Sequence, residues 1–220
     1  GSYAALMFKM WVRGFLTKHA ESVPVSEPIS TGCEPIDELL GGGLERGIVT
    51  QVYGSPASGK TNLALSAAVQ VAAGGGTVLY IDTEGVSLDR FEALARHEAA
   101  DEDLEAVTSR VILSDAIDFE EQREAVQDAG ELADRADLIV LDSATGFYRL
   151  ERDNNDEGKT LRTVAKQVTH LLALARRHDL AVLTTNQVYA DPDTDSSRPK
   201  PLGGHTLTHW SGAVIRLERF

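Results

Sequence analysis

A run of small residues between two apolar segments constrains the fold of this chain more than any other feature. Residues 54–61 fit the pattern G-x-x-x-x-G-K-[ST] between a strand predicted at 48–53 and a helix predicted at 60–73. Small residues let the backbone curl until successive N–H groups point inward, and the helix adds its unpaired N-terminal N–H groups. The sequence therefore predicts a strand–loop–helix unit that binds the phosphates of a nucleoside triphosphate.

Each part of this phosphate loop has an expected role. The backbone cradles the phosphates, the Lys60 ammonium reaches the β- and γ-phosphates, and the Thr61 hydroxyl binds Mg²⁺. The predicted nucleotide-binding residues are Gly54, Ser55, Pro56, Ala57, Ser58, Gly59, Lys60 and Thr61.

Apolar segments of strand length alternate with helical patterns along the rest of the chain. Residues 24–47 are expected to be irregular, a helix is expected after Ser87, and another from Asp118 to about residue 133. The clearest helical periodicity spans 161–175. Further strands are predicted at 77–82, 111–113, 138–141, 181–184 and 213–217. Several strands are apolar throughout, which predicts an α/β fold with a mostly parallel twisted sheet and helices on both faces.

Polar side chains follow three of these strands, at the edge where parallel sheets bind ligands. Asp142 ends an apolar strand, as the carboxylate that holds Mg²⁺ does in nucleoside triphosphatases with this loop. Glu84 is the candidate general base for a water that attacks the γ-phosphate. The alternative is that Asp82 or Glu84 is a solvated loop charge. Asn186 and Gln187 end a later strand, where their amides could sense the γ-phosphate.

The chain is acidic, with 21 Lys and Arg, 34 Asp and Glu, and a net charge of −13. Such a body repels nucleic acids and anionic membranes at long range unless salt or a local basic patch intervenes. The one cysteine, Cys33, excludes an internal disulfide, and no apolar stretch approaches membrane-spanning length. We therefore expect a cytoplasmic protein in a reducing compartment, without a membrane partner. A salt-rich cytoplasm is one setting in which such an acidic surface makes sense.

Two parts of unequal size are expected. Residues 1–23 form an N-terminal appendage, in which 1–2 look like the remnant of an expression tag. Residues 3–20 carry Met7, Trp11 and Phe15 on one helical face, so they are either a docking helix or vector-derived sequence. Residues 24–220 form the core.

A series of motifs follows one order along the chain: residues 29–32, 36–47, the phosphate loop, 81–85, 138–143, 185–188 and Gly203-Gly204-His205. Together they resemble the core of the RecA/RadA recombinase family. The resemblance runs from about residue 27 to the C-terminus and is closest to a short archaeal paralogue that lacks a helix-hairpin-helix domain. The acidic composition suits a halophilic archaeon.

The resemblance implies ATP and Mg²⁺ at a subunit interface of a RecA-like ATPase core. It gives Asp142 to the water shell of the metal, and Glu84 matches the family's water-activating glutamate. Gln187 matches the residue that links the γ-phosphate to DNA binding. Arg90 resembles the arginine that stacks on adenine, although one residue fewer separates it from Glu84, and an exposed helical arginine is the alternative.

The resemblance also implies two DNA-binding loops, after Asp142 and after Gln187. They contain Arg149, Arg152, Arg198 and Lys200, and the alternative is that both are solvated polar loops. So few basic residues in an acidic body predict weak, salt-sensitive binding of single-stranded DNA. His205 and His209 lie near the second loop, where a structural or phosphate-linked role is favoured over a metal site.

The expected function is that of an accessory in homologous recombination and DNA repair. The family resemblance implies self-association or a recombinase partner, and Phe15 is one candidate for the oligomerisation hook. The chain stops at Phe220 on a predicted strand where recombinases continue, so we expect weak or absent ATP hydrolysis. The rival is a regulatory or signalling ATPase of the RecA superfamily that assembles protein partners without DNA. A metabolic kinase would need an acceptor pocket and an arginine-bearing lid, and the sequence offers neither.

Overall fold

A parallel sheet carries the phosphate loop at its centre. The computed structural model describes residues 26–148, 157–189 and 200–218. Its strands follow the order β3-β2-β4-β5-β1-β7, with every neighbouring pair parallel. A short strand, β6 (Lys200–Pro201), pairs antiparallel with β5. The six other strands are β1 (Val49–Gly54), β2 (Val78–Asp82), β3 (Val111–Asp115), β4 (Leu138–Asp142), β5 (Ala181–Tyr189) and β7 (Ala213–Leu217).

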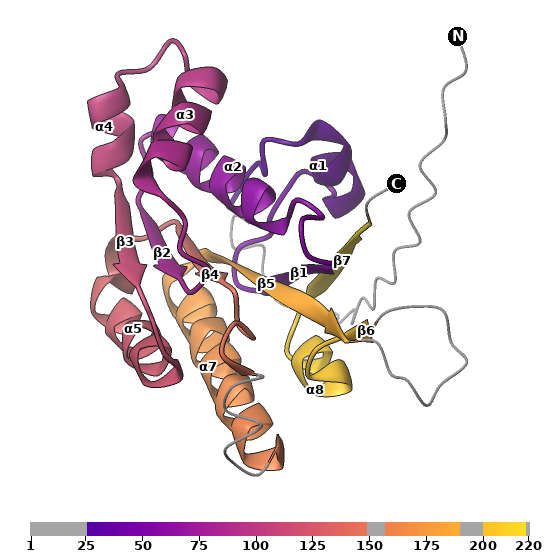
Figure 1. Cartoon of the computed structure of the whole chain (residues 1–220). Coiled ribbons are helices and arrows are strands. Elements are labelled where there is room, and N and C mark those ends of the chain that lie inside the picture. Colours follow the sequence, from indigo (N-terminus) through magenta and orange to yellow (C-terminus); the bar gives the residue numbers. More distant parts are fainter. Residues whose placement is uncertain (1–25, 149–156, 190–199, 219–220) are drawn as a thin grey trace, which may run out of the picture.

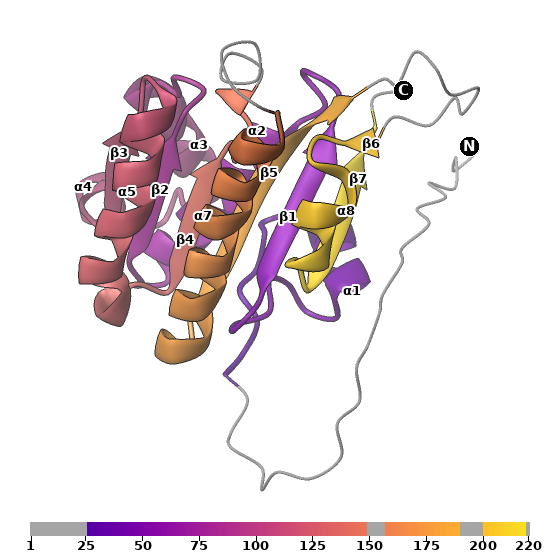
Figure 2. The same cartoon turned by 90° about the horizontal axis from the view of Figure 1, so that it is seen from below.

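Helices cover both faces of the sheet, as Figures 1 and 2 show. One face carries α1 (Glu34–Leu40), α2 (Lys60–Ala73), α3 (Leu88–Glu98) and α4 (Leu104–Ser109). The other carries α5 (Phe119–Leu132), the 3-10 turn η1 (Ala133–Arg135), α7 (Glu157–His178) and α8 (Gly204–His209). Two apolar clusters fill the space between helices and sheet, one on each face. The predicted α/β architecture is confirmed.

Neighbouring residues of the central strands point to opposite clusters. Val140 packs toward α2, whereas Ile139 and Leu141 pack toward α7. All five residues of β4 are buried, because a strand covered on both faces has no solvent side. Burial on both faces of the sheet explains the near-continuous apolar runs in the sequence.

Helix starts follow their capping residues. The Ser87 hydroxyl accepts a hydrogen bond from Arg90 N at the start of α3, and the Asp118 carboxylate accepts one from Glu121 N at the start of α5. Both predicted starts are therefore confirmed, since these side chains satisfy N–H groups that the helix leaves unpaired.

The prediction that residues 24–47 are irregular is wrong over 34–40, where α1 forms. Pro35 lies in the first turn, where proline needs no N–H partner, and Gly41 ends the helix at a left-handed φ of 78°. The sequence also missed α4 and α8, and it ended β5 five residues too early. Pro35 and Gly41 therefore mark the two ends of α1 and do not interrupt the helix.

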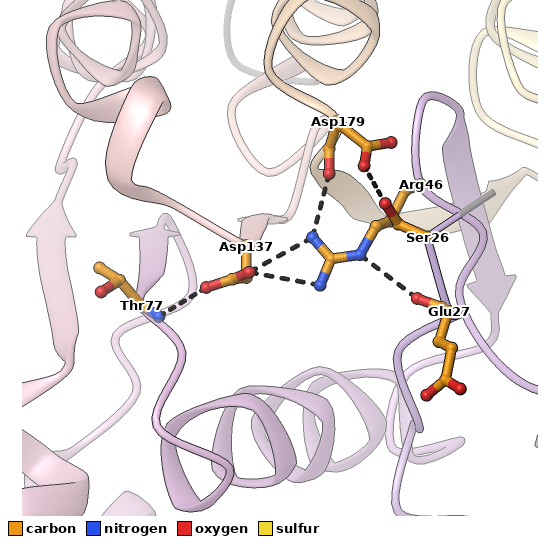
Figure 3. Close-up of polar contacts among 6 residues, drawn as sticks. All are labelled: Ser26, Glu27, Arg46, Thr77, Asp137 and Asp179. Atoms are coloured by element: carbon orange, nitrogen blue, oxygen red, sulfur yellow. Dashed lines mark hydrogen bonds and ion pairs between the residues drawn. The ribbon is translucent and has the colours of Figure 1, made fainter. Parts of the chain in front are cut away.

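The Arg46 side chain connects the first described residues to the amino ends of the strands, which lie opposite the phosphate loop; Figure 3 shows these contacts. Its guanidinium donates to Asp137 Oδ1 at 3.3 Å, to Asp179 O at 3.0 Å and to Glu27 O at 3.3 Å. Asp137 Oδ2 in turn accepts from Thr77 N at 3.1 Å. Asp137, Asp179 and Thr77 precede β4, β5 and β2. Arg46 therefore joins the amino ends of β4 and β5 directly, and that of β2 through Asp137, to the segment that leads into α1.

In the part of the chain that the structure describes, no helix combines the length and the apolar character needed to cross a membrane.

Candidate nucleotide-binding site

The phosphate loop joins the end of β1 to the start of α2, as predicted. Gly54 is its tightest position: a Cβ there would lie 2.3 Å from Leu217 O and 2.6 Å from Ser58 Oγ. Gly59 caps α2 with a φ of 99°, and Ala57 also has a positive φ, of 60°. The loop therefore needs glycine at its first position for space and at Gly59 for backbone conformation.

Lys60 folds over this loop. Its Nζ donates to the carbonyl oxygens of Gly54 and Ser55, both at 2.9 Å. Burial lowers the pKa of Lys60, and the carboxylates of Asp142 and Glu84 act in the opposite direction. The ammonium thus lies at the loop within the field of two carboxylates.

Asp142 is buried at the end of β4 and is held from two neighbouring strands. Its Oδ2 accepts from the Tyr80 hydroxyl at 2.9 Å, and its Oδ1 accepts from Thr185 Oγ1. Burial, followed by the Asp142 charge, raises the pKa of Tyr80 well above its ordinary value, so this hydroxyl stays a donor. The carboxylate is fixed in place at the edge where β4 ends.

Asp82 shapes the turn that carries Glu84. Its Oδ1 accepts from Glu84 N at 2.8 Å and Gly85 N at 3.1 Å, and its Oδ2 accepts from Val86 N. Burial raises the pKa of Asp82, although these backbone bonds act against the shift. The interpretation of Asp82 as a solvated loop charge is therefore wrong, because this side chain is buried and holds the backbone.

Glu84 is exposed and is oriented by Ser143, the residue after Asp142. Glu84 Oε1 accepts from Ser143 Oγ at 2.8 Å, while Ser143 N donates to Thr83 Oγ1 at 2.7 Å. The segments that follow β2 and β4 are therefore linked side chain to side chain. We did not predict a role for Ser143, and its place directly after Asp142 was the available signal.

Gln187 lies beside the phosphate loop because β5 continues through it. In the parallel pairing of β1 with β5, Gly54 is opposite Gln187. Its neighbour Asn186 is fully buried and bridges two segments: Asn186 Oδ1 accepts from Thr145 Oγ1 at 2.6 Å, and Asn186 Nδ2 donates to Leu202 O at 2.8 Å. This bridge joins the segment after β4 to the segment before α8.

Of the remaining predicted site residues, some lie in the described part of the chain and others lie outside it. Arg90 is exposed on α3 and its Nη2 donates to the Oδ1 of Asn62, the residue after Thr61, at 2.6 Å. Lys200 is exposed on β6. Arg149, Arg152 and Arg198 lie outside the described residues, as does the N-terminal appendage. Among the described residues no group of three or more His, Cys, Asp or Glu could hold a metal ion, so His205 and His209 form no such cluster.

The donor set at this edge fits a nucleoside triphosphate with Mg²⁺. The Lys60 ammonium lies over the loop, Thr61 in the first turn of α2 supplies a hydroxyl, and Asp142 and Glu84 supply carboxylates. Ser58 Oγ is buried without a hydrogen-bond partner in the loop, which leaves a polar atom for a ligand to satisfy. Hydroxyl and carboxylate oxygens are the ligands that Mg²⁺ prefers.

Comparisons with known proteins agree with the family resemblance found in the sequence. The family model described as Rad51 matches residues 25–219. The chain is 62% identical over 193 residues to the DNA repair and recombination protein RadB of Halobacterium salinarum, which covers 87% of this chain and 81% of the relative. It is 40% identical over 197 residues to RadB of Methanococcoides burtonii, covering 89% and 84%. A solved structure described as the RadB recombinase aligns with a TM-score of 0.72 and 35% identity, covering 87% of this chain and 84% of that one.

Proposed function

This chain belongs to the Rad51 family, and from that premise we propose that it is an ATP- and DNA-binding recombinase paralogue that assists homologous recombination and DNA repair. The relatives are named DNA repair and recombination proteins, and this chain shares 62% identity with one of them. Its own hydrolysis of ATP is weak or absent, and any hydrolysis depends on DNA.

One observation carries the proposal: the four chain segments that contain Lys60, Glu84, Asp142 and Gln187 meet at the same edge of the sheet. The Lys60 ammonium lies in the field of Asp142 and Glu84. Gly54 pairs with Gln187, and Asp82 pairs with Asp142. Side chains that are distant in sequence are thus grouped around the phosphate loop.

Each residue has a proposed task toward ATP. Lys60 exchanges the carbonyl oxygens of Gly54 and Ser55 for phosphate oxygens, and the loop N–H groups contact the phosphates. Arg90, anchored by Asn62, stacks on the adenine. Mg²⁺, when bound with the nucleotide, neutralises charge on the β- and γ-phosphates, and Thr61 and Asp142 would hold it.

Glu84 is the proposed general base for ATP hydrolysis. Ser143 holds one carboxylate oxygen at 2.8 Å, which leaves the other oxygen of this exposed side chain to orient a water and take its proton. Gln187, which pairs with Gly54, would contact the γ-phosphate. A change in this contact would then be transmitted along β5.

The two segments proposed to bind single-stranded DNA, which contain Arg149, Arg152, Arg198 and Lys200, are joined at their bases. The Asn186 amide connects Thr145 to Leu202, and Gln187 follows Asn186 in the chain. A change at the γ-phosphate would therefore reach both segments through adjacent residues. Binding should be weak and salt-sensitive, because the whole chain carries a charge of −13.

Self-association through residues 24–220, the proposed ATPase core, is part of the proposal, with residues 1–23 as an appendage. The edge strand β3 exposes Ile112 and Leu113 at 40% and 41%, and Ile117 just beyond it is 78% exposed. An edge strand with apolar side chains offers both unpaired backbone groups and apolar area to another chain.

ATP turnover with and without single-stranded DNA tests the proposal. We expect slow turnover that DNA stimulates in the parent and that Lys60→Ala and Glu84→Gln both abolish. Equal rates in all three proteins would remove the catalytic assignment. Absence of any DNA complex in gel shifts with Mg·ATP, at low and at high salt, would favour the alternative of a regulatory ATPase that assembles proteins without DNA.

A further inference from the structure

Helix α7 differs in charge from the rest of this acidic chain. Its 22 residues hold five of the 21 Lys and Arg but one of the 34 Asp and Glu. By contrast, its neighbour on the same face, α5, carries five acidic residues and one arginine. The face of the sheet seen in Figure 2 therefore combines an acidic helix with a basic one.

Three of the basic residues form a stripe at the start of α7. Lys159, Arg162 and Lys166 are spaced by three and four residues, so they lie on one side of the helix. All three are exposed. Two further basic residues, Arg176 and Arg177, are exposed at the opposite end of the same helix.

The charges of this stripe are not neutralised within the described chain. Arg46, Arg96, Arg123, Arg135 and Arg216 each pair with a carboxylate. Within the same described ranges, none of the three stripe residues forms an ion pair, and Arg162 Nε instead donates to the backbone oxygen of Gly158 at 3.0 Å. A basic stripe without an ion pair in the described part of an acidic chain stays available for an external anion.

The chemistry of the surface favours a nucleic acid over a protein as that anion. Protein interfaces centre on aromatic and apolar side chains. The large apolar side chains that the described chain exposes lie elsewhere, at Leu88, Ile112, Leu113, Ile117 and Trp210. Protein–nucleic acid interfaces are more polar and more positively charged, since Lys and Arg contact phosphates.

The position of the stripe agrees with this. Helix α7 starts at the edge of the sheet that carries the phosphate loop and runs toward the opposite edge (Figure 2). From Lys159 to Lys166 the stripe extends about 10 Å along the helix axis at about 1.5 Å per residue. Three cationic side chains spread over that length can contact neighbouring phosphates along one strand.

We propose that Lys159, Arg162 and Lys166 form a contact site for the phosphate backbone of single-stranded DNA, outside the two segments that follow β4 and β5. The inference rests on the proposed function, in that it adds residues to its DNA-binding surface. The stripe carries no sequence readout, because charged side chains on phosphates are indifferent to the base. It supplies the local basic patch that lets an acidic body approach a polyanion.

The test measures the affinity for a fluorescent oligothymidine, with Mg·ATP, across a series of KCl concentrations. One variant combines Lys159→Ala, Arg162→Ala and Lys166→Ala. The matched control combines Arg176→Ala and Arg177→Ala, which removes exposed positive charge from the other end of the same helix. A third variant combines Lys159→Arg, Arg162→Lys and Lys166→Arg, which keeps the charge. Thermal unfolding and Mg·ATP affinity verify that each variant is folded.

The expected result is a change in the salt dependence. Single-stranded DNA loses about 0.7 in the slope of log K against log salt for each phosphate contact removed, so the triple alanine variant should lose about 2. The far-end control and the charge-keeping variant should match the parent. Equal slopes for the parent and the triple variant would overturn the inference, as would an equal loss in the far-end control, which would mean that net charge alone matters.

Two other outcomes separate the inference from the function on which it rests. A parent that fails to bind the oligonucleotide at any salt concentration overturns the proposed DNA binding and this site with it. A triple variant that binds DNA like the parent but loses self-association in sedimentation overturns only the site, and assigns the stripe to a protein contact.

Discussion

Asp82 shows at the scale of one residue how the candidate site is built. Its buried carboxylate accepts three backbone N–H groups and so fixes the turn that presents Glu84. The Asp82 carboxylate holds the backbone of the turn, whereas the Glu84 side chain, two residues later, is exposed to solvent. The two carboxylates therefore have separate tasks that the sequence alone did not distinguish.

Asp82→Asn should reveal the raised pKa of this carboxyl. The folded state holds the Asp82 proton more tightly than the unfolded chain, so Asp82 stabilises the fold most below its ordinary value of 3.8. This contribution is lost as pH rises through the raised pKa. In urea unfolding, the stability of the parent relative to Asp82→Asn should therefore fall as pH rises above about 4. A difference that stays constant or rises with pH would contradict this.

At the scale of elements, a buried polar bridge connects the ends of three of them. Asn186 of β5 takes a hydrogen bond from Thr145, just after β4, and donates one to Leu202, just before α8. Thr145 and Asn186 are both buried, so neither can find water as a substitute partner. The bridge therefore joins the bases of the two proposed DNA-binding segments.

A double-mutant cycle tests this bridge. Thr145→Val removes the hydroxyl at nearly constant volume and leaves Asn186 Oδ1 unpaired, which should cost about 1–3 kcal/mol in the free energy of unfolding. Combined with Asn186→Ala, it should show a coupling of about 0.5–3 kcal/mol. Thr169→Val is the control, because that hydroxyl bonds to Lys166 O within α7, and its effect should add to that of Asn186→Ala. Additive behaviour of Thr145→Val would mean that no bridge is present.

The β3 edge carries the prediction at the scale of the whole molecule. If copies associate there, Ile112→Lys and Leu113→Lys should shift the protein toward monomer in sedimentation, because a buried ammonium without a partner opposes association. Leu88→Lys is the matched control: Leu88 is 57% exposed at the start of α3, and it is not part of β3. A parent that is monomeric at every concentration, or a control that dissociates equally, would contradict the assignment.

Much of the architecture could be predicted from the sequence because its signals are local. The phosphate loop, the alternation of strands with helices and the caps at Ser87 and Asp118 each lie within a few neighbouring residues. The motif series predicted the recombinase family, and the match to residues 25–219 confirms it. Helix α1 was missed because Pro35 and three glycines were interpreted as breakers, although proline suits a first turn and Gly41 a helix end.

The contacts that complete the site could not be predicted, since they join residues far apart in the chain. Ser143 contacts Glu84 across 59 positions, and Thr145 contacts Asn186 across 41. Nothing local marks such pairs, because they exist only once β2, β4 and β5 lie side by side. The order of the strands was likewise absent from the prediction.

The central claim, that the loop at residues 54–61 grips a nucleoside triphosphate through Lys60, is tested most directly by calorimetric titration with Mg·ATP. The account predicts one site in the parent and an affinity about tenfold or more lower in Lys60→Ala, because a hydrogen bond to a charged group contributes about 1.5–3 kcal/mol. Lys166→Ala, which removes the same charge on α7, should bind Mg·ATP like the parent. A parent that gives no heat of binding by any nucleotide, or a Lys60→Ala variant that binds as tightly as the parent, would contradict the account.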